Sequence, residues 1–318
     1  MSLTSLIQYR KFLFMPFSGV SEGVSPAKPP SSNIVDWHRK IFISLIVASL
    51  VIWYQPIVST IKLALHNDAY THILLILPIS IALIFSERKA LHSLSWSFGW
   101  LGWFLISGGV LLRDLGVLLK ADSGLPLTML GLVLWWIGAV ISCFGVRALR
   151  AFLFPLCFLF LSAPLPEQSV EKIKDILQHQ SAFATAILFH AAGVPVARDG
   201  VAVSIPGLDI EVAKECSSIR SSTMLIVITL VLAYLFLGSW WRRLLLVGMS
   251  LLLSVAKNAV RIFTIAELGT QVDPGYLHGR LHHQGGVVFL GLAIVVDLFF
   301  LWVLRGSEFR ASASSNSC

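Results

Sequence analysis

The sequence predicts an all-α polytopic membrane protein with about eight transmembrane helices, plus a small periplasmic amphipathic helix and β-meander before the sixth span. Of its 318 residues, 56% are hydrophobic and only 13% are charged, against about 25% charged residues in soluble chains. Mean hydropathy is +0.80. A water-facing core cannot hide this much apolar surface, so lipid must cover much of it. A soluble protein is therefore excluded. The net charge of +7 fits basic cytoplasmic loops, and nothing in the composition indicates a nucleic-acid partner.

Eight apolar runs are candidates to cross a bilayer about 30 Å thick. They are Ile41–Ile61, Ile73–Phe85, Phe98–Leu112, Leu125–Gly145, Phe152–Leu165, Ser221–Leu237, Leu244–Phe263 and Gly286–Leu304. The second and fifth runs are short. We therefore expect residues 1–40 to form a cytoplasmic N-terminal tail without a cleaved signal peptide, residues 41–304 to form the membrane domain, and residues 305–318 to form a cytoplasmic C-terminal tail.

The distribution of basic residues predicts the orientation. Short loops that face the cytoplasm carry an excess of Lys and Arg. With both termini on the cytoplasmic side, each short inner loop is basic, including the one at Arg242 and Arg243, whereas the acids gather on the opposite side. The pattern predicts a multi-pass protein of a bacterial-type inner membrane with a periplasmic insert at about residues 166–215.

The periplasmic insert has two predicted parts. Its first part, Val170–Ala192, is polar in its first half and apolar in its second, which is typical of an amphipathic helix on the membrane surface. A ninth span over Ala182–Ala197 is disfavoured, because this stretch is short and crossing there would move the Arg242 loop outside. The second part contains three short β-prone runs separated by turn residues, which predicts a meander. These runs are Val194–Ala197, Val201–Ile205 and Leu208–Val212.

One of the four cysteines stands apart from the others. Cys143 and Cys157 lie inside apolar runs and Cys318 ends the chain, with no metal-binding spacing. Cys216 instead comes directly before the sixth span, at the start of a predicted helix. Unpaired amide donors there, together with Arg220 one turn later, favour a thiolate. The alternative is that Cys216 is a small buried apolar residue, as most free cysteines are.

Two further polar clusters adjoin later spans. Lys257, Asn258 and Arg261 lie within the seventh apolar run, where charges are costly and usually functional. Asn258 and Arg261 share a helix face, although both cations could also snorkel to the interface. His282 and His283, near His278, precede the eighth span. Histidines here fit a general base or a weak metal site. The predicted orientation places Cys216, Arg261 and these histidines at one membrane face.

Three segments carry motifs that occur together, in this order, in one known family. They contain Ala213, Cys216, Ser217, Arg220 and Ser221, then Asn258 and Arg261, and then His282, Gly286, Phe289 and Gly291. Weaker signals are Tyr70-Thr71-His72 with Pro78, and Phe154-Pro155 with Pro164-Leu165-Pro166. From about Tyr70 onward the chain resembles the exosortase/archaeosortase family of membrane-embedded cysteine transpeptidases.

This resemblance implies a catalytic set and a reaction. Cys216, Arg261 and His282 match the family's catalytic cysteine, arginine and histidine, with Asn258, Arg220 and His283 as supporting residues. Cysteine would attack a peptide carbonyl to form a thioester that another nucleophile resolves. The implied substrates are exported proteins with a C-terminal Pro-containing motif (PEP-CTERM-like), a transmembrane helix and a basic tail, transferred to an unknown acceptor. No cofactor or metal is expected.

Two alternatives stay open from the sequence. One is a multi-pass transporter in which Arg261 and Asp297 pair or line a pathway. The other is a non-catalytic scaffold of a polysaccharide export system. The absence of a visible internal repeat weighs against a transporter, and the presence of all three matched residues weighs against a scaffold.

Overall fold

Helices dominate the computed structural model, which places residues 32–87, 99–119, 124–212, 219–277 and 280–315. The N-terminal half contains α2 (Ser32–Ile52), α3 (Tyr54–His66), η1 (Asp68–Tyr70), α4 (Ile73–Ser86), α6 (Trp100–Leu119), α7 (Gly124–Ala151), α8 (Leu153–Phe158) and η2 (Leu159–Ser162). The C-terminal half contains α9 (Glu167–Ala191), β1 (Ala197–Asp199), β2 (Ala202–Ile205), β3 (Leu208–Glu211), α10 (Ile219–Phe236), α11 (Trp240–Gln271), η4 (Pro274–Leu277) and α12 (Arg280–Ser315).

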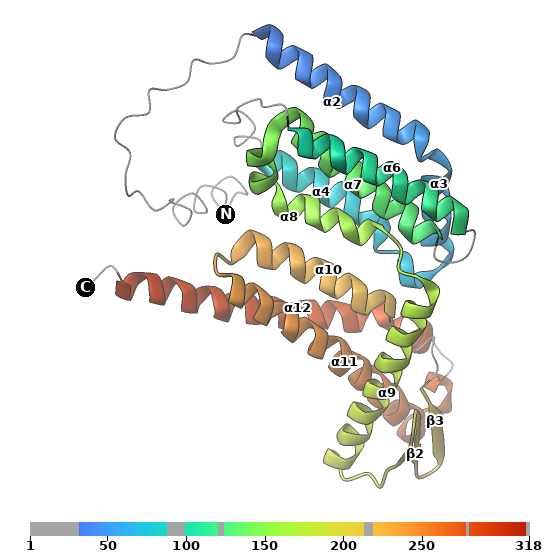
Figure 1. The fold of residues 1–318 in the computed structure, drawn as a ribbon. Coiled ribbons are helices and arrows are strands. Elements are labelled where there is room, and N and C mark those ends of the chain that lie inside the picture. The colour runs from blue at the N-terminus through green and yellow to red at the C-terminus, as the bar shows by residue number, and fades with distance from the viewer. Residues whose placement is uncertain (1–31, 88–98, 120–123, 213–218, 278–279, 316–318) are drawn as a thin grey trace.

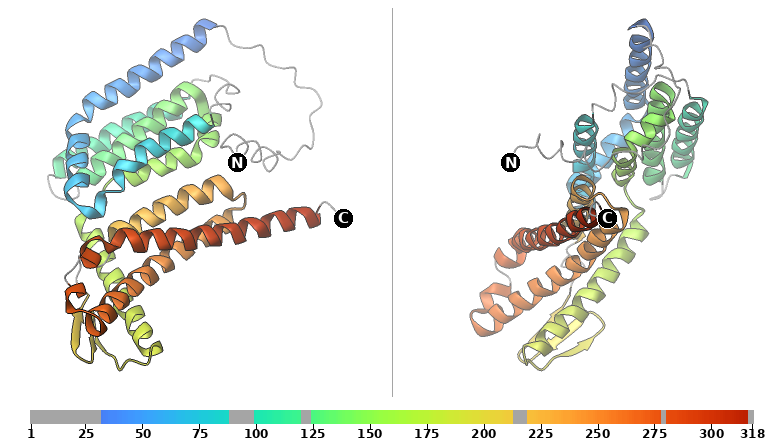
Figure 2. Two further views of the ribbon diagram at one scale, coloured as in Figure 1. Left: turned by 180° about the vertical axis from the view of Figure 1, so that it is seen from behind. Right: turned by 90° about the vertical axis from the view of Figure 1, so that its left-hand side faces the viewer.

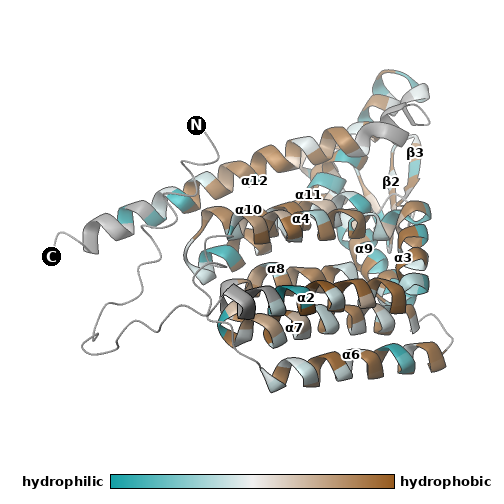
Figure 3. Ribbon diagram, turned by 90° about the horizontal axis from the view of Figure 1, so that it is seen from above, coloured by the Kyte–Doolittle hydropathy of each residue, from teal (hydrophilic) through white to brown (hydrophobic). Residues whose placement is uncertain are grey.

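The two halves form separate helical groups (Figure 1). The α2, α4, α6, α7 and α8 helices run side by side in one group, and α10, α11 and α12 form the other, which we call the three-helix bundle. From behind, α9 and the sheet project from one end of the molecule (Figure 2). Most residues of the long helices are hydrophobic, whereas hydrophilic residues are frequent in α9 and at one end of α11 (Figure 3). The architecture is that of an all-α polytopic membrane protein.

The predicted number of spans depends on how bent helices are counted. Among the described residues, six helices are long and apolar enough to cross a membrane, and two further pairs pass the same test only when their two helices are taken together. The prediction of eight spans therefore holds if each bent pair makes one crossing. These pairs are α2 with α3 and α8–η2 with α9.

The first predicted span, Ile41–Ile61, is not continuous. It breaks at Trp53, and α2 and α3 differ in direction by 68°. Pro56 lies in the first turn of α3 and has no N–H to donate to the carbonyl of Ile52, so a straight helix cannot continue there. Trp53 is fully buried at the break, where its indole Nε1 donates to the Thr128 carbonyl at 2.8 Å.

The fourth predicted span, Leu125–Gly145, lies within α7, and the apolar stretch of this helix continues to Leu149. Gly145 has φ 76° and ψ 173°, a backbone conformation that glycine adopts at little cost. The helix α7 therefore kinks at this residue, and α8 begins soon after α7 ends at Ala151. The fifth predicted span, Phe152–Leu165, is shorter than expected because α8 and η2 end at Ser162, before Pro164 and Pro166. The chain then turns by 94° into α9.

Three helices are longer than the spans predicted for them. The helix α6 continues past Leu112 to Leu119, and α11 extends eight residues beyond Phe263 to Gln271. The last helix continues through the predicted tail as far as Ser315. Helices outlast apolar runs because backbone hydrogen bonding does not stop where the side chains become polar. Of the two cysteines predicted to fill apolar space, Cys143 is buried but Cys157 is exposed on α8.

The insert predicted before the sixth span contains the expected helix and meander. The strands pair antiparallel in the order β1-β2-β3. The first strand lies later than predicted, because Arg198 and Asp199 pair with Val203 and Ala202 instead of forming the turn. Gly200, with φ 59°, makes the turn itself. The predicted Val170–Ala192 helix corresponds to α9, in which Ala182 and Phe189 pack against α11 and the sheet.

Candidate active site

The candidate site lies at the end of the three-helix bundle next to α9, which we call the α9 end. Contacts along the bundle fix the relative direction of its helices. Arg243 of α11 lies over the Tyr234 ring of α10, while Lys257 of α11 reaches Ser221 at the start of α10. These two helices are therefore antiparallel, and α12 returns alongside α10. The first turn of α10, the later turns of α11 and the first turn of α12 consequently share the α9 end.

Two buried polar side chains of α11 join it to neighbouring helices. Lys257 is only 6% exposed and its Nζ donates a hydrogen bond to Ser221 Oγ of α10. Asn258 is 1% exposed, and its Nδ2 donates to Ser181 Oγ of α9 at 2.9 Å. Among the described residues, Lys257 forms no salt bridge. The snorkelling interpretation is therefore wrong for Lys257, whose ammonium points into the protein.

The chain on either side of residues 213–218 is held by these same helices. Before this segment, Val212 is buried, and its carbonyl accepts a hydrogen bond from Gln178 of α9. After it, Arg220 pairs with Asp68 of η1 at 3.0 Å, and Ser221 is bonded to Lys257. Both ends of the segment that contains Cys216 are thus anchored at the α9 end.

The two weaker sequence motifs meet beside this site. Tyr70 of η1 is buried, and its hydroxyl donates to the Leu165 carbonyl at 2.9 Å. The bond joins the early motif at Tyr70 to the mid-chain Pro-bounded motif. Tyr70 also belongs to an apolar cluster that includes Val170 of α9 and Ile219 of α10. The N-terminal half therefore supports the first turns of α9 and α10.

The structure places the predicted site residues to different extents. Arg261, Asn258 and Arg220 are described, and all three lie at the α9 end. Cys216 lies outside the described residues, as does His278. For His282 and His283 the backbone forms the beginning of α12, whereas their side chains are outside the description. The structure thus brings the α11 residues next to α9 and to the start of α10, and the closeness of Cys216, Arg261 and His282 side chains stays a prediction.

Polar residues of α9 are the part of the site that the sequence reasoning missed. Gln178, Ser181 and Thr185 are buried on one helix face. Residues spaced by three and four positions lie on one face of a helix. The prediction from the sequence considered only that this helix is polar in its first half and apolar in its second. The spacing of these polar residues could have predicted a buried face on this helix. It distinguishes a face that packs against protein from one that meets lipid.

Asp297 does not join this site. It is 1% exposed within α12 and accepts a hydrogen bond from Thr229 Oγ1 of α10 at 2.8 Å. The Arg261–Asp297 pair considered for a transporter is therefore not formed. Across the described residues, no group of three His, Cys, Asp or Glu side chains is arranged to hold a metal ion.

The fold and these contacts define a multi-pass membrane protein whose helical bundle has buried polar side chains, with Lys257 and Asn258 bonded to neighbouring helices at the α9 end. The chain belongs to the transmembrane exosortase family, whose model matches residues 41–299. No curated protein and no solved structure matches it. The family match confirms the resemblance that the three motifs indicated.

Proposed function

We propose that this chain is a cysteine transpeptidase that cleaves the C-terminal sorting tail of exported proteins. Family membership supports this assignment. The structural observation that carries it is the anchoring of both ends of the Cys216 segment by buried polar residues. Gln178 binds the chain before the segment and Lys257 binds the chain after it. Buried polar bonds in a membrane protein are expensive and are usually retained for function.

The proposed reaction has two acyl-transfer steps. In the first, the Cys216 thiolate attacks the scissile carbonyl, the C–N bond breaks, and His282 gives a proton to the leaving amine. In the second, an acceptor nucleophile gives a proton to His282 and attacks the thioester, which releases the thiolate. Water as the nucleophile would give hydrolysis instead of transfer.

Arg261 has the electrostatic role in this proposal. Its guanidinium keeps its charge at any physiological pH and would hold the oxyanion that forms at the carbonyl. Lys257 lies one turn earlier on the same helix, so two cations adjoin the α9 end. Asn258 is bonded to Ser181 and fixes α11 against α9. Arg220 and His283 are proposed as supporting residues.

The proposed substrates carry a Pro-containing motif, a transmembrane helix and a basic tail. A tail that is already in the membrane reaches the enzyme by lateral diffusion, which reduces the entropy cost of encounter. We place the enzyme in the inner membrane with both termini in the cytoplasm and the α9 end in the periplasm. The acceptor is left unassigned.

The decisive experiment is substitution of Cys216. We expect Cys216→Ala to abolish processing of a tailed substrate while the protein accumulates normally, and Cys216→Ser to lose nearly all activity because a hydroxyl is a far weaker nucleophile. Cys143→Ala and Cys157→Ala are the controls, and both should process substrate. Immunoblots of substrate length at matched membrane levels measure the result. Equal loss in all three alanine variants, or activity in Cys216→Ala, would refute the proposal.

Reporter fusions test the orientation separately. A fusion at Gly238 should report the cytoplasm, and one at Asp209, in the β3 strand, should report the periplasm. The reverse result at either position would place the α9 end in the cytoplasm, away from exported substrates.

A further inference from the structure

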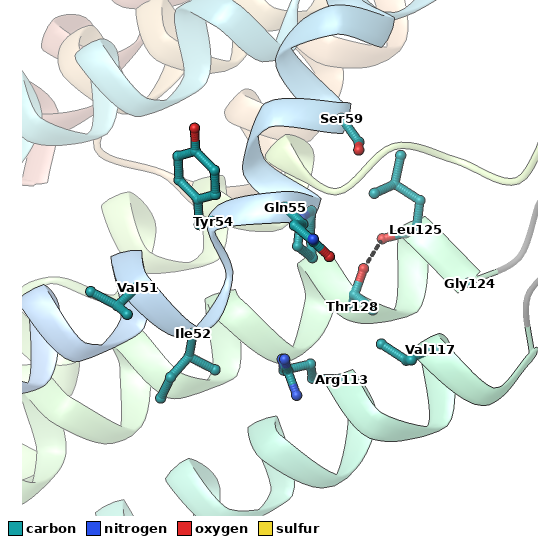
Figure 4. A pocket seen from close by; sticks show the side chains of 12 residues that line it. Val51, Ile52, Tyr54, Gln55, Ser59, Arg113, Val117, Gly124, Leu125 and Thr128 are labelled. Atoms are coloured by element: carbon teal, nitrogen blue, oxygen red, sulfur yellow. Dashed lines mark hydrogen bonds between the residues drawn. The ribbon is translucent and has the colours of Figure 1, made fainter.

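A cavity of about 840 Å³ lies in the N-terminal half, away from the candidate active site (Figure 4). It forms where the bend between α2 and α3 faces α6 and α7. Its volume falls in the range of ligand sites, roughly 300–1,000 Å³. None of the predicted site residues lines it. The break at Trp53 creates this space, because α3 turns away from the line of α2.

Arg113 is the charged residue of the cavity wall. It lies within the apolar helix α6, six residues before the helix ends at Leu119, where a cation is costly and by default functional. Its Nη1 donates to Asp114 at 2.8 Å, and the guanidinium lies over the Trp53 ring at 5.9 Å. Among the described residues, no group accepts a hydrogen bond from Nη2, and the buried Nε has no acceptor either.

The remaining lining is divided between polar and apolar side chains. Gln55 and Ser59 of α3 supply an amide and a hydroxyl. Val51, Ile52 and Val117 are exposed apolar residues at the same cavity, and lipid chains would meet such residues in a membrane. The cavity therefore offers hydrogen-bond donors and an apolar wall together, which suits a ligand with an acidic head and a hydrocarbon tail.

We propose that this cavity binds one membrane phospholipid through its phosphate. Arg113 would donate from Nη2 to a phosphate oxygen, Gln55 and Ser59 would bond the rest of the head group, and the acyl chains would lie along Val51 and Val117. Asp114 occupies only Nη1, so it balances the arginine charge and leaves the Nη2 donor for the ligand. The depth also fits, because six residues of helix place Arg113 roughly 9 Å below the end of α6.

Native mass spectrometry of the purified full chain in detergent tests this proposal. The titrated ligands are dioleoyl phosphatidylglycerol, dioleoylglycerol with the same chains but no phosphate, and soluble glycerophosphoglycerol. We expect one phosphatidylglycerol to bind, and Arg113→Gln to weaken it about tenfold or more, as for loss of a charge-assisted hydrogen bond. Gln55→Leu, an exposed change on α3 that leaves the core intact, should weaken it about threefold through loss of a neutral bond.

The matched control is Arg198→Gln, which removes an equal charge from a residue that also lies over an aromatic ring, Phe183. It should bind lipid like the wild type. Equal binding by the wild type and both cavity variants would overturn the proposal, as would equal binding of dioleoylglycerol. Binding of glycerophosphoglycerol as tight as that of the lipid would show a site for soluble phosphates and would also overturn it.

Discussion

Different kinds of contact hold the helices together within each half of this protein. In the N-terminal half, α6 and α7 meet through facing glycines, whereas in the C-terminal half α9 to α12 are joined by buried hydrogen bonds between side chains. Glycine contacts give close packing without any reactive group. Buried polar contacts cost desolvation and so are more often tied to function. The contrast fits the proposal that the second half contains the chemistry and the first half supports it.

The glycine contacts of the N-terminal half occur at three levels along α6 and α7. Gly102 faces Gly138, Gly109 faces Gly131, and Gly116 faces Gly124. A Cβ added at Gly109 would lie 2.6 Å from the Gly131 carbonyl oxygen. The helix backbones are therefore in direct contact, and the interface has no room for a methyl group.

The bundle of the C-terminal half carries polar side chains along its interior. Ser250 and Ser254 are buried on one face of α11, which continues to Lys257 and Asn258. At the end of the bundle away from α9, Glu308 accepts hydrogen bonds from the backbone of Gly238 and Ser239. Buried polar residues therefore span the bundle, but the cations Lys257 and Arg261 belong to the α9 end.

The largest expected effect is that of His282→Ala. If His282 transfers the protons, removing it should lower the rate of processing by about 10²–10⁴, the usual contribution of general acid–base catalysis. The protein should still accumulate, because the change lies outside the N-terminal half. His283→Ala is the neighbouring control and should have a mild effect. Processing rates at matched membrane levels decide the assignment, and near-normal activity of His282→Ala would shift attention to His278 or His283.

Arg261→Lys should cause the next largest loss. It keeps the charge but replaces a planar donor fork with a compact ammonium, and loss of one oxyanion contact costs about 10²–10³ in rate. Arg198→Lys, on the sheet, provides a matched control. Reaction of Cys216 with an alkylating reagent should persist in the variant, because the nucleophile is intact. Turnover close to that of the wild type would remove Arg261 from the catalytic set.

Gly109→Ala, in the N-terminal half, should lower the stability of the protein without changing its catalytic activity. The added methyl group meets backbone and forces α6 from α7, which costs about 1–3 kcal/mol as overpacking does. Gly108 is the adjacent control, since a Cβ there meets nothing within 4 Å, and Gly108→Ala should be neutral or slightly stabilising. Thermal unfolding in detergent measures both. Reduced activity per folded molecule in Gly109→Ala would mean that the N-terminal half also takes part in catalysis.

Local sequence features predicted the parts of this fold that depend on local physics. The turns at Gly200 and Pro206-Gly207 divide the meander as expected, and Gly145 marks a kink in α7 instead of the end of a span. The break at Trp53 was missed because the apolar run continues through it, although Pro56 supplied a signal. The candidate site also has parts that the sequence predicts and parts that it does not. Cys216, Arg261 and His282 were selected by motif, but Asn258 and Ser181 are 77 residues apart, and only tertiary packing determines such a contact.

The smallest expected effect concerns the buried pair of Thr229 and Asp297. Hydrogen bonds between helices in membrane proteins contribute about 0.6 kcal/mol on average and at most about 1.7. Thr229→Val keeps the shape and removes the donor, so it should lower the free energy of unfolding by about 1 kcal/mol and leave processing unchanged. Thr229→Ser, which retains the hydroxyl, should lie nearer to the wild type. Denaturant titrations measure the stability. If Thr229→Val instead abolished processing at normal protein levels, the polar interior of the bundle would be part of the mechanism, and the α9 end would no longer account for the chemistry alone.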